Sequence, residues 1–333
     1  MTTTSLSEAL RTAHGLTADA AHEDTHHDDV SAVHAAERIA WAMSRELAPA
    51  VSLSRVSIAP MWLEPWAACQ PLAKSGIVRL LRTATIVKTK TGLVCIDPCL
   101  PDAWARTPLG ERMRSLHERG TSETFPLTLA QALGATDQLS RADARSPFTE
   151  VIFTSLAIQS MRELLGTTHG DGVEGTLAPF FPGARIILGA GALTRARTEA
   201  ERATDVRGGL SRLRADQLVE IHEPTLLPSG LVVIPTGGVV PEHLTVAFVQ
   251  QIDRARVAVV TSQCTSREQL SPYESSLPGL REHARLRDAD VAPRGDAANT
   301  AVHLRALRFE RSLADRDPAD PRFHLVHPSQ SLG

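Results

Sequence analysis

The segment "FTEVIFTSLAIQSMRELLG", residues 148–166, most constrains how this chain can fold. Its first part, Glu150 to Thr154, is the short apolar run expected of a buried strand. Beyond it the apolar side chains recur with helical spacing, at Ile158, Met161, Leu164 and Leu165. The segment therefore predicts a strand that turns directly into a helix.

Further apolar runs predict strands in both halves of the chain. "IVRLLRTATIVKT" and "GLVCIDPCL" flank "KTKTG" and predict an antiparallel hairpin. Later strands are expected in "FPGARIILG", "LVEIHEP", "GLVVIPTGG", "HLTVAFVQ", "ARVAVVTSQ" and "FHLVHP", and helices at 30–47, 190–217, 278–290 and 296–313. Sheets in both halves with helices after each predict an α/β fold, a four-layer αββα sandwich of two packed mixed β-sheets with outer helices.

Composition narrows the class of partner. The net charge of -3 and the pI near 6.5 give no basic face for nucleic acid or an anionic membrane, so neither is expected as a partner. No apolar run reaches the roughly 18 residues of a membrane span, and no signal peptide is evident, which predicts a cytoplasmic protein. The four cysteines, Cys69, Cys95, Cys99 and Cys264, are expected to be free thiols.

The N-terminal 30 residues are polar and predict a flexible extension, followed by a single domain over 31–333. The extension includes "HEDTHHDD", with His22, His26 and His27. A metal-binding tract is the alternative reading, but side chains on an unstructured segment lack the preorganised geometry that metal affinity requires.

Five landmarks occur along the chain in the order that one known family has them. They are "ATIVKTKTGLVCIDPCL", which contains Asp97, "LAQALGATDQLSRADARSPFTEVIFTS", "FFPGARIILGAGAL", "GLVVIPTGGVVPEHLTVAF" and "RARVAVVTSQCTS". Over roughly residues 77–328 the chain resembles the metallo-β-lactamase fold superfamily, in its branch of lactonases and organophosphate hydrolases. This resemblance implies the same αββα fold.

The metal-binding residues of that family's motif are replaced by other residues in this chain. The family has Thr-His-x-His-x-Asp-His, and Thr154 matches its threonine, but the four ligand positions hold Ser155, Ala157, Gln159 and Ser160. The later ligands fall on Gly238 or Val239 and near Ser262, which leaves His327 as the single counterpart. Catalytic zinc keeps about three protein ligands, so the resemblance implies a degenerate member with no metal cofactor. His169 and Asp171, in "TTHGDGVEG", are an alternative source of relocated ligands.

The strand ends still predict a pocket for a polar organic molecule. Candidate substrate-binding residues are Ser155, Gln159, Ser160, Thr236, Ser262, Gln263 and Trp66, and candidate catalytic residues are His327, Cys264, Asp97 and His243. For Asp97 and His243 the favoured reading is a hydrogen-bonded structural role. Cys264 and His327 form a thiolate–imidazolium pair only if they meet; otherwise Cys264 is a buried, inert thiol. Trp66 belongs either to a lid or to a packed loop.

Three functions stay open at this point. The first is a metal-independent enzyme, hydrolase- or lyase-like, that acts on a small organic molecule in bacterial specialised metabolism. The second is a non-catalytic binding or regulatory pseudoenzyme, and the third is a metallo-hydrolase with relocated ligands. The expected partner is a small-molecule ligand, and a homodimer is the alternative to a monomer. The sequence does not name the substrate.

Overall fold

The computed structural model describes residues 4–18, 25–63, 78–98, 148–155, 183–194, 215–237, 242–251 and 255–260, and short pieces at 306, 309–310, 312–313, 325–326 and 329–331. The chain divides into two compact units. The first comprises Met1–Ala50, Glu64–Val78 and Ile221–His327, and the second Val51–Leu63, Arg79–Glu220 and Pro328–Gly333. Each unit is built on one sheet, so the predicted α/β class with two mixed sheets and helices is confirmed.

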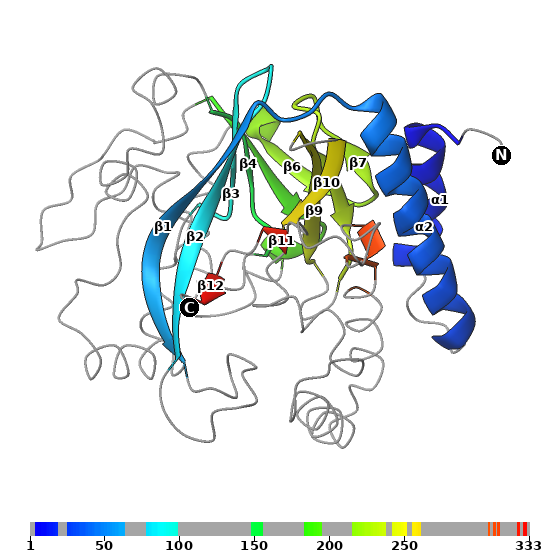
Figure 1. The fold of residues 1–333 in the computed structure, drawn as a ribbon, viewed down its shortest axis with the longest axis horizontal. Coiled ribbons are helices and arrows are strands. Elements are labelled where there is room, and N and C mark those ends of the chain that lie inside the picture. Colours follow the sequence, from blue (N-terminus) through cyan, green and yellow to red (C-terminus); the bar gives the residue numbers. More distant parts are fainter. Residues whose placement is uncertain are drawn as a thin grey trace, which may run out of the picture. The chain divides into compact units, whose positions relative to one another are not determined.

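The second unit is built on a seven-stranded sheet in the order β1-β2-β3-β4-β5-β6, with β12 paired to β2 (Figure 1). Its strands are β1 (Ser52–Leu63), β2 (Val78–Lys88), β3 (Leu93–Ile96), β4 (Phe148–Ile152), β5 (Arg185–Gly189), β6 (Leu218–Ile221) and β12 (Ser329–Ser331), with the short helix η3 (Ala215–Gln217) before β6. β2 and β3 form the predicted antiparallel hairpin. β3, β4 and β5 are mutually parallel, so their carboxyl ends meet at one edge.

The first unit is built on a five-stranded sheet in the order β11-β10-β9-β8-β7. Its strands are β7 (Thr225–Leu226), β8 (Val232–Pro235), β9 (Leu244–Gln251), β10 (Ala255–Val260) and β11 (Leu325–Val326). The neighbours β7 to β10 are antiparallel, whereas β11 runs parallel to β10. Because every strand expected between 218 and 260 was a β-branched apolar run, the sequence located each of them.

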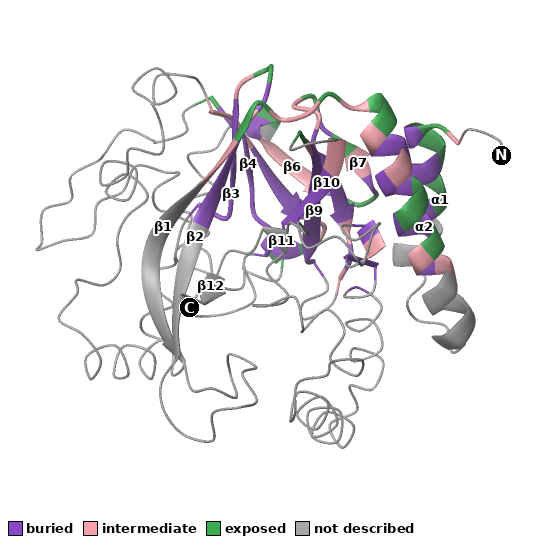
Figure 2. Ribbon diagram, in the orientation of Figure 1, coloured by how far each residue is buried: buried purple, intermediate pink, exposed green. Residues whose placement is uncertain are grey.

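Helices α1 (Leu6–Ala18) and α2 (Thr25–Glu46) cover one face of this five-stranded sheet (Figure 1). α2 packs on β9 and β10, and α1 packs on α2. Their buried sides are rich in alanine, which allows close approach, and they enclose the larger Ile39 and Met43 against Val232, Ile234 and Val249. In Figure 2 most of β9 is buried, whereas both helices carry exposed residues.

The N-terminal segment differs from its expected form. Residues 6–18 form a helix where the sequence analysis predicts a flexible extension. Leu6, Ala9, Leu10 and Ala13 repeat at helical spacing and are buried against α2, and the carboxylate of Glu46 accepts the N–H of Leu6 at 3.0 Å. Tertiary burial of this narrow apolar stripe outweighs the polar composition that suggested disorder. No helix in the described part of the chain is long and apolar enough to cross a membrane.

Candidate functional site

The carboxyl edge of β3, β4 and β5 carries a buried carboxylate. Asp97 follows β3 directly, and its Oδ1 accepts the N–H of Thr154 at 2.9 Å while its Oδ2 accepts the Thr154 hydroxyl at 2.6 Å. Asp97 also has a φ of 53°, in the left-handed region that aspartate tolerates better than most residues. This geometry fits the structural reading of Asp97, because both carboxylate oxygens tie the end of β3 to the end of β4.

Ser155 lies next to this contact. It follows Thr154 and is buried, at the position where the resembled family has the first histidine of its metal motif. The carboxyl edge of parallel strands is the usual place for a ligand in an open α/β sheet. The described polar side chains at this edge are the carboxylate of Asp97, the hydroxyl of Thr154 that donates to it, and the hydroxyl of Ser155.

Of the ligand positions of the resembled metal motif, the structure describes Ser155, which carries a hydroxyl. Within the ranges that the structure describes, no three His, Cys, Asp or Glu side chains gather closely enough to hold a metal ion. Neutral hydroxyls are poor ligands for zinc, which takes thiolate, imidazole or carboxylate. Because both donors of Thr154 go to Asp97, the hydroxyl of Ser155 is the group suited to a hydrogen bond with an organic molecule.

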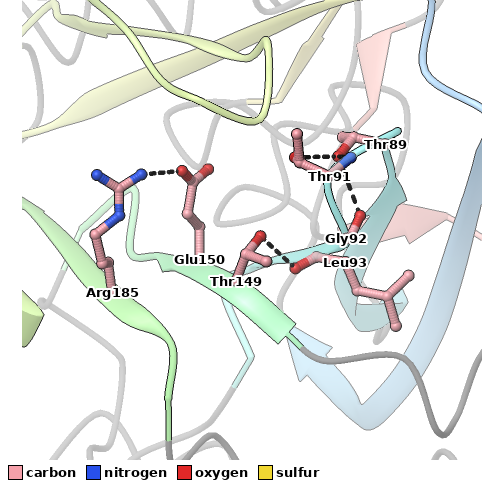
Figure 3. Close-up of polar contacts among 7 residues, drawn as sticks. All are labelled: Thr89, Thr91, Gly92, Leu93, Thr149, Glu150 and Arg185. Atoms are coloured by element: carbon pink, nitrogen blue, oxygen red, sulfur yellow. Dashed lines mark hydrogen bonds and ion pairs between the residues drawn. The ribbon is translucent and has the colours of Figure 1, made fainter.

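The middle of β4 carries a charged residue that is paired across the sheet. Glu150 is buried, and its carboxylate pairs with the guanidinium of Arg185 on the neighbouring strand β5 (Figure 3). Near the same end of the sheet, the Thr149 hydroxyl donates to the carbonyl of Leu93 at 3.3 Å. In the hairpin turn, the Thr89 hydroxyl donates to the carbonyl of Gly92 at 3.1 Å. We interpret these contacts as ties between strands.

A second polar cluster lies in the first unit, where β8 and β9 meet. His243 Nδ1 is 3.2 Å from the Thr236 hydroxyl, which is 2.9 Å from the Thr245 hydroxyl. The Thr245 hydroxyl donates to Glu310 Oε1. All four side chains are buried, and we name this set the His243–Glu310 chain. Thr236 and His243 are thus two candidate residues that the structure brings into direct contact.

Glu310 and Thr245 were not among the site residues predicted from the sequence. Ala306, Phe309 and Leu313 are helical, buried and spaced as one face of a helix. Glu310 lies on the same face and is also buried. An acid in the apolar stripe of a helix is the signal that would have identified it, because a buried carboxylate requires a donor. For Thr245 no sequence signal existed, since threonine is common in strands.

The remaining candidates lie outside the described residues. They are Trp66, Gln159, Ser160, Ser262, Gln263, Cys264 and His327, together with His22, His169 and Asp171 and the loop positions Gly238 and Val239. His26 and His27 lie in the first turn of α2, and their side chains are not described.

Comparison with known proteins gives structural likeness alone. No family model and no curated protein matches the chain. An N-acyl homoserine lactone hydrolase with bound N-hexanoyl-L-homoserine is 14% identical over 74% of this chain and 91% of its own, with a TM-score of 0.45. Hydrolase AbOPH of the beta lactamase superfamily is 11% identical over 84% and 87%, with a TM-score of 0.49.

A probable metal-dependent hydrolase from Staphylococcus aureus is 13% identical over 73% of this chain and 86% of its own, with a TM-score of 0.44. These neighbours are metallo-β-lactamase-fold lactonases and hydrolases. The sequence landmarks resemble the same superfamily. The activities of the three neighbours are their own, because function belongs to sites and not to folds.

Proposed function

We propose that the protein is an enzyme that acts on a small polar organic molecule without a dinuclear metal centre. One observation carries the proposal: at the carboxyl edge of the parallel strands, Asp97 accepts both the N–H and the hydroxyl of Thr154, and the next residue along the chain is the buried Ser155, whose hydroxyl replaces the first histidine of the resembled motif. A site of this kind suits a neutral ligand that both donates and accepts hydrogen bonds.

The proposal gives the named residues different roles. Ser155 binds substrate, together with Gln159 and Ser160 of the same motif. Asp97 is a positioning residue that holds Thr154, and hence the start of the Ser155 segment, in place. Acid–base chemistry falls to His327 or His243, with Cys264 as the nucleophile if a covalent step occurs.

The test starts with protein purified in the absence of chelator. Elemental analysis gives the metal content, and a panel of lactones, carboxylic esters and phosphotriesters is then screened for hydrolysis before and after dialysis against a chelator. Turnover without stoichiometric metal, unchanged by the chelator, is the expected result. Two transition-metal ions per chain with chelator-sensitive turnover would overturn the proposal in favour of relocated ligands.

Variants then separate an enzyme from a binding protein. Ser155→Ala is expected to weaken substrate binding at least tenfold, whereas His327→Gln or Cys264→Ser lowers kcat. The matched control is Thr149→Val, which removes a hydroxyl from the opposite end of the same strand and should leave KM and kcat unchanged. Binding of a panel compound with no turnover in any preparation would favour the non-catalytic alternative.

A further inference from the structure

The number of hydroxyl protons in the His243–Glu310 chain sets the direction of each of its hydrogen bonds. A threonine hydroxyl carries a single proton and can donate one hydrogen bond. Because Thr245 donates to Glu310 Oε1, its 2.9 Å contact with Thr236 requires Thr236 to donate. Thr236 then has no proton for the imidazole, and its 3.2 Å contact requires His243 Nδ1 to donate.

We propose that Glu310, acting through Thr245 and Thr236, holds His243 in the Nδ1–H tautomer, so that Nε2 carries the lone pair. Glu310, Thr245 and Thr236 are positioning residues in this proposal. It goes beyond the proposed function, and it stands whether or not the chain proves to be an enzyme.

The reverse order of donors is the alternative. A protonated Glu310 would donate to Thr245, Thr245 to Thr236, and Thr236 to Nδ1, which would place the proton on Nε2. We favour the order that ends on Glu310 as a carboxylate, because a hydroxyl bound to an ionised acceptor makes the stronger and shorter bond. The two orders predict opposite tautomers, so a single measurement separates them.

The tautomer has a chemical consequence at Nε2. In the neutral ring Nε2 then offers only a lone pair, which accepts a hydrogen bond from a donor or binds a cation. A water or substrate hydroxyl in that position would be oriented for proton abstraction. Carboxylates that fix a histidine through Nδ1 serve general bases in this way, here with two hydroxyls in between.

The first test is the ¹⁵N spectrum of the full chain labelled at histidine, at pH 8. The resonances of His243 are assigned from those that disappear in His243→Gln. A protonated, pyrrole-like shift at Nδ1 and an unprotonated, pyridine-like shift at Nε2 are expected. The opposite pattern, or a ring protonated at both nitrogens, would overturn the proposal.

The second test breaks the chain without changing its shape. In Thr245→Val, Thr236 loses its acceptor and can donate to Nδ1, so the ring should convert at least in part to the Nε2–H form. Thr245→Ser keeps the hydroxyl and should retain the wild-type tautomer. Thr85→Val, which removes a buried hydroxyl from the seven-stranded sheet, is the matched control. A folded Thr245→Val protein with the wild-type tautomer would contradict the role given to Thr245. If that variant does not fold, the ¹⁵N spectrum of the wild-type protein still distinguishes the two tautomers.

Discussion

Asp97 and Thr154 are 57 residues apart in sequence and joined by two hydrogen bonds that use both carboxylate oxygens of Asp97. The N–H of Asp97 also donates to the carbonyl of Ile152 at 2.9 Å. The ends of two parallel strands are thereby held in register at the edge where we place the substrate. The contribution of the Asp97–Thr154 contact to stability can be measured independently of any activity.

Replacing Asp97 with asparagine should weaken this connection. Asparagine tolerates the same left-handed backbone, so the change isolates the hydrogen bonds. One of the two Thr154 donors would then face an amide nitrogen, at a cost of about 1–3 kcal/mol in the free energy of unfolding. Urea denaturation of Asp97→Asn measures the loss of unfolding free energy. A variant as stable as the wild type would show that the Asp97 carboxylate does not stabilise the contact between the ends of β3 and β4.

The ion pair of Glu150 and Arg185 predicts an asymmetry between single and double variants. Arg185→Ala leaves the charge of Glu150 buried without its guanidinium, which should cost about 3 kcal/mol, the lower end for buried pairs because Arg185 is partly exposed. The double variant Glu150→Leu with Arg185→Met removes both charges and should recover most of that loss. Equal loss in the single and double variants, seen in denaturant unfolding, would rule out this explanation.

Replacing Thr85 with valine should change the free energy of unfolding in the opposite direction to the same replacement in the His243–Glu310 chain. It is buried on β2, and its hydroxyl has no hydrogen-bond partner in the described structure. Thr85→Val keeps the shape and removes this polar group, so the free energy of unfolding should rise by roughly 1 kcal/mol. Thr245→Val should lower it by a similar amount or more. A fall in the midpoint of urea unfolding for Thr85→Val would contradict the expectation.

Gly230 should resist substitution for backbone reasons alone. It has a φ of 85° in the turn between β7 and β8, where its N–H donates to the carbonyl of Leu227, and a Cβ would meet no atom within 4 Å. Gly230→Ala should therefore cost about 1 kcal/mol through the left-handed backbone. Gly183 has equally open surroundings without a positive φ. Thermal unfolding of Gly183→Ala should show no loss, and an equal loss at both glycines would point to another cause.

The sequence predicted the strands better than the helices at the N-terminus. β6, β8, β9 and β10 are rich in valine or isoleucine and were predicted, because local preference and tertiary burial agree there, whereas the two-residue β7 was not predicted. β1 was not predicted, although the β-branched Val56 and Ile58 stand on either side of Ser57. α1 has a narrow apolar stripe that is meaningful only beside α2, which is why composition suggested an extension instead.

At the candidate site, too, some features could be predicted from the sequence and others required the tertiary structure. That Thr154 and Ser155 lie at the end of a strand, which the structure ends at Ile152, and that no imidazole stands at Ser155, followed from the order of residue types in "FTEVIFTS". That Asp97 holds Thr154, and that His243 connects to Glu310 across 67 residues, required the fold. Local patterns record which backbone a segment prefers, whereas hydrogen bonds between distant side chains depend on strand register and helix placement, which are set by the burial of the whole core.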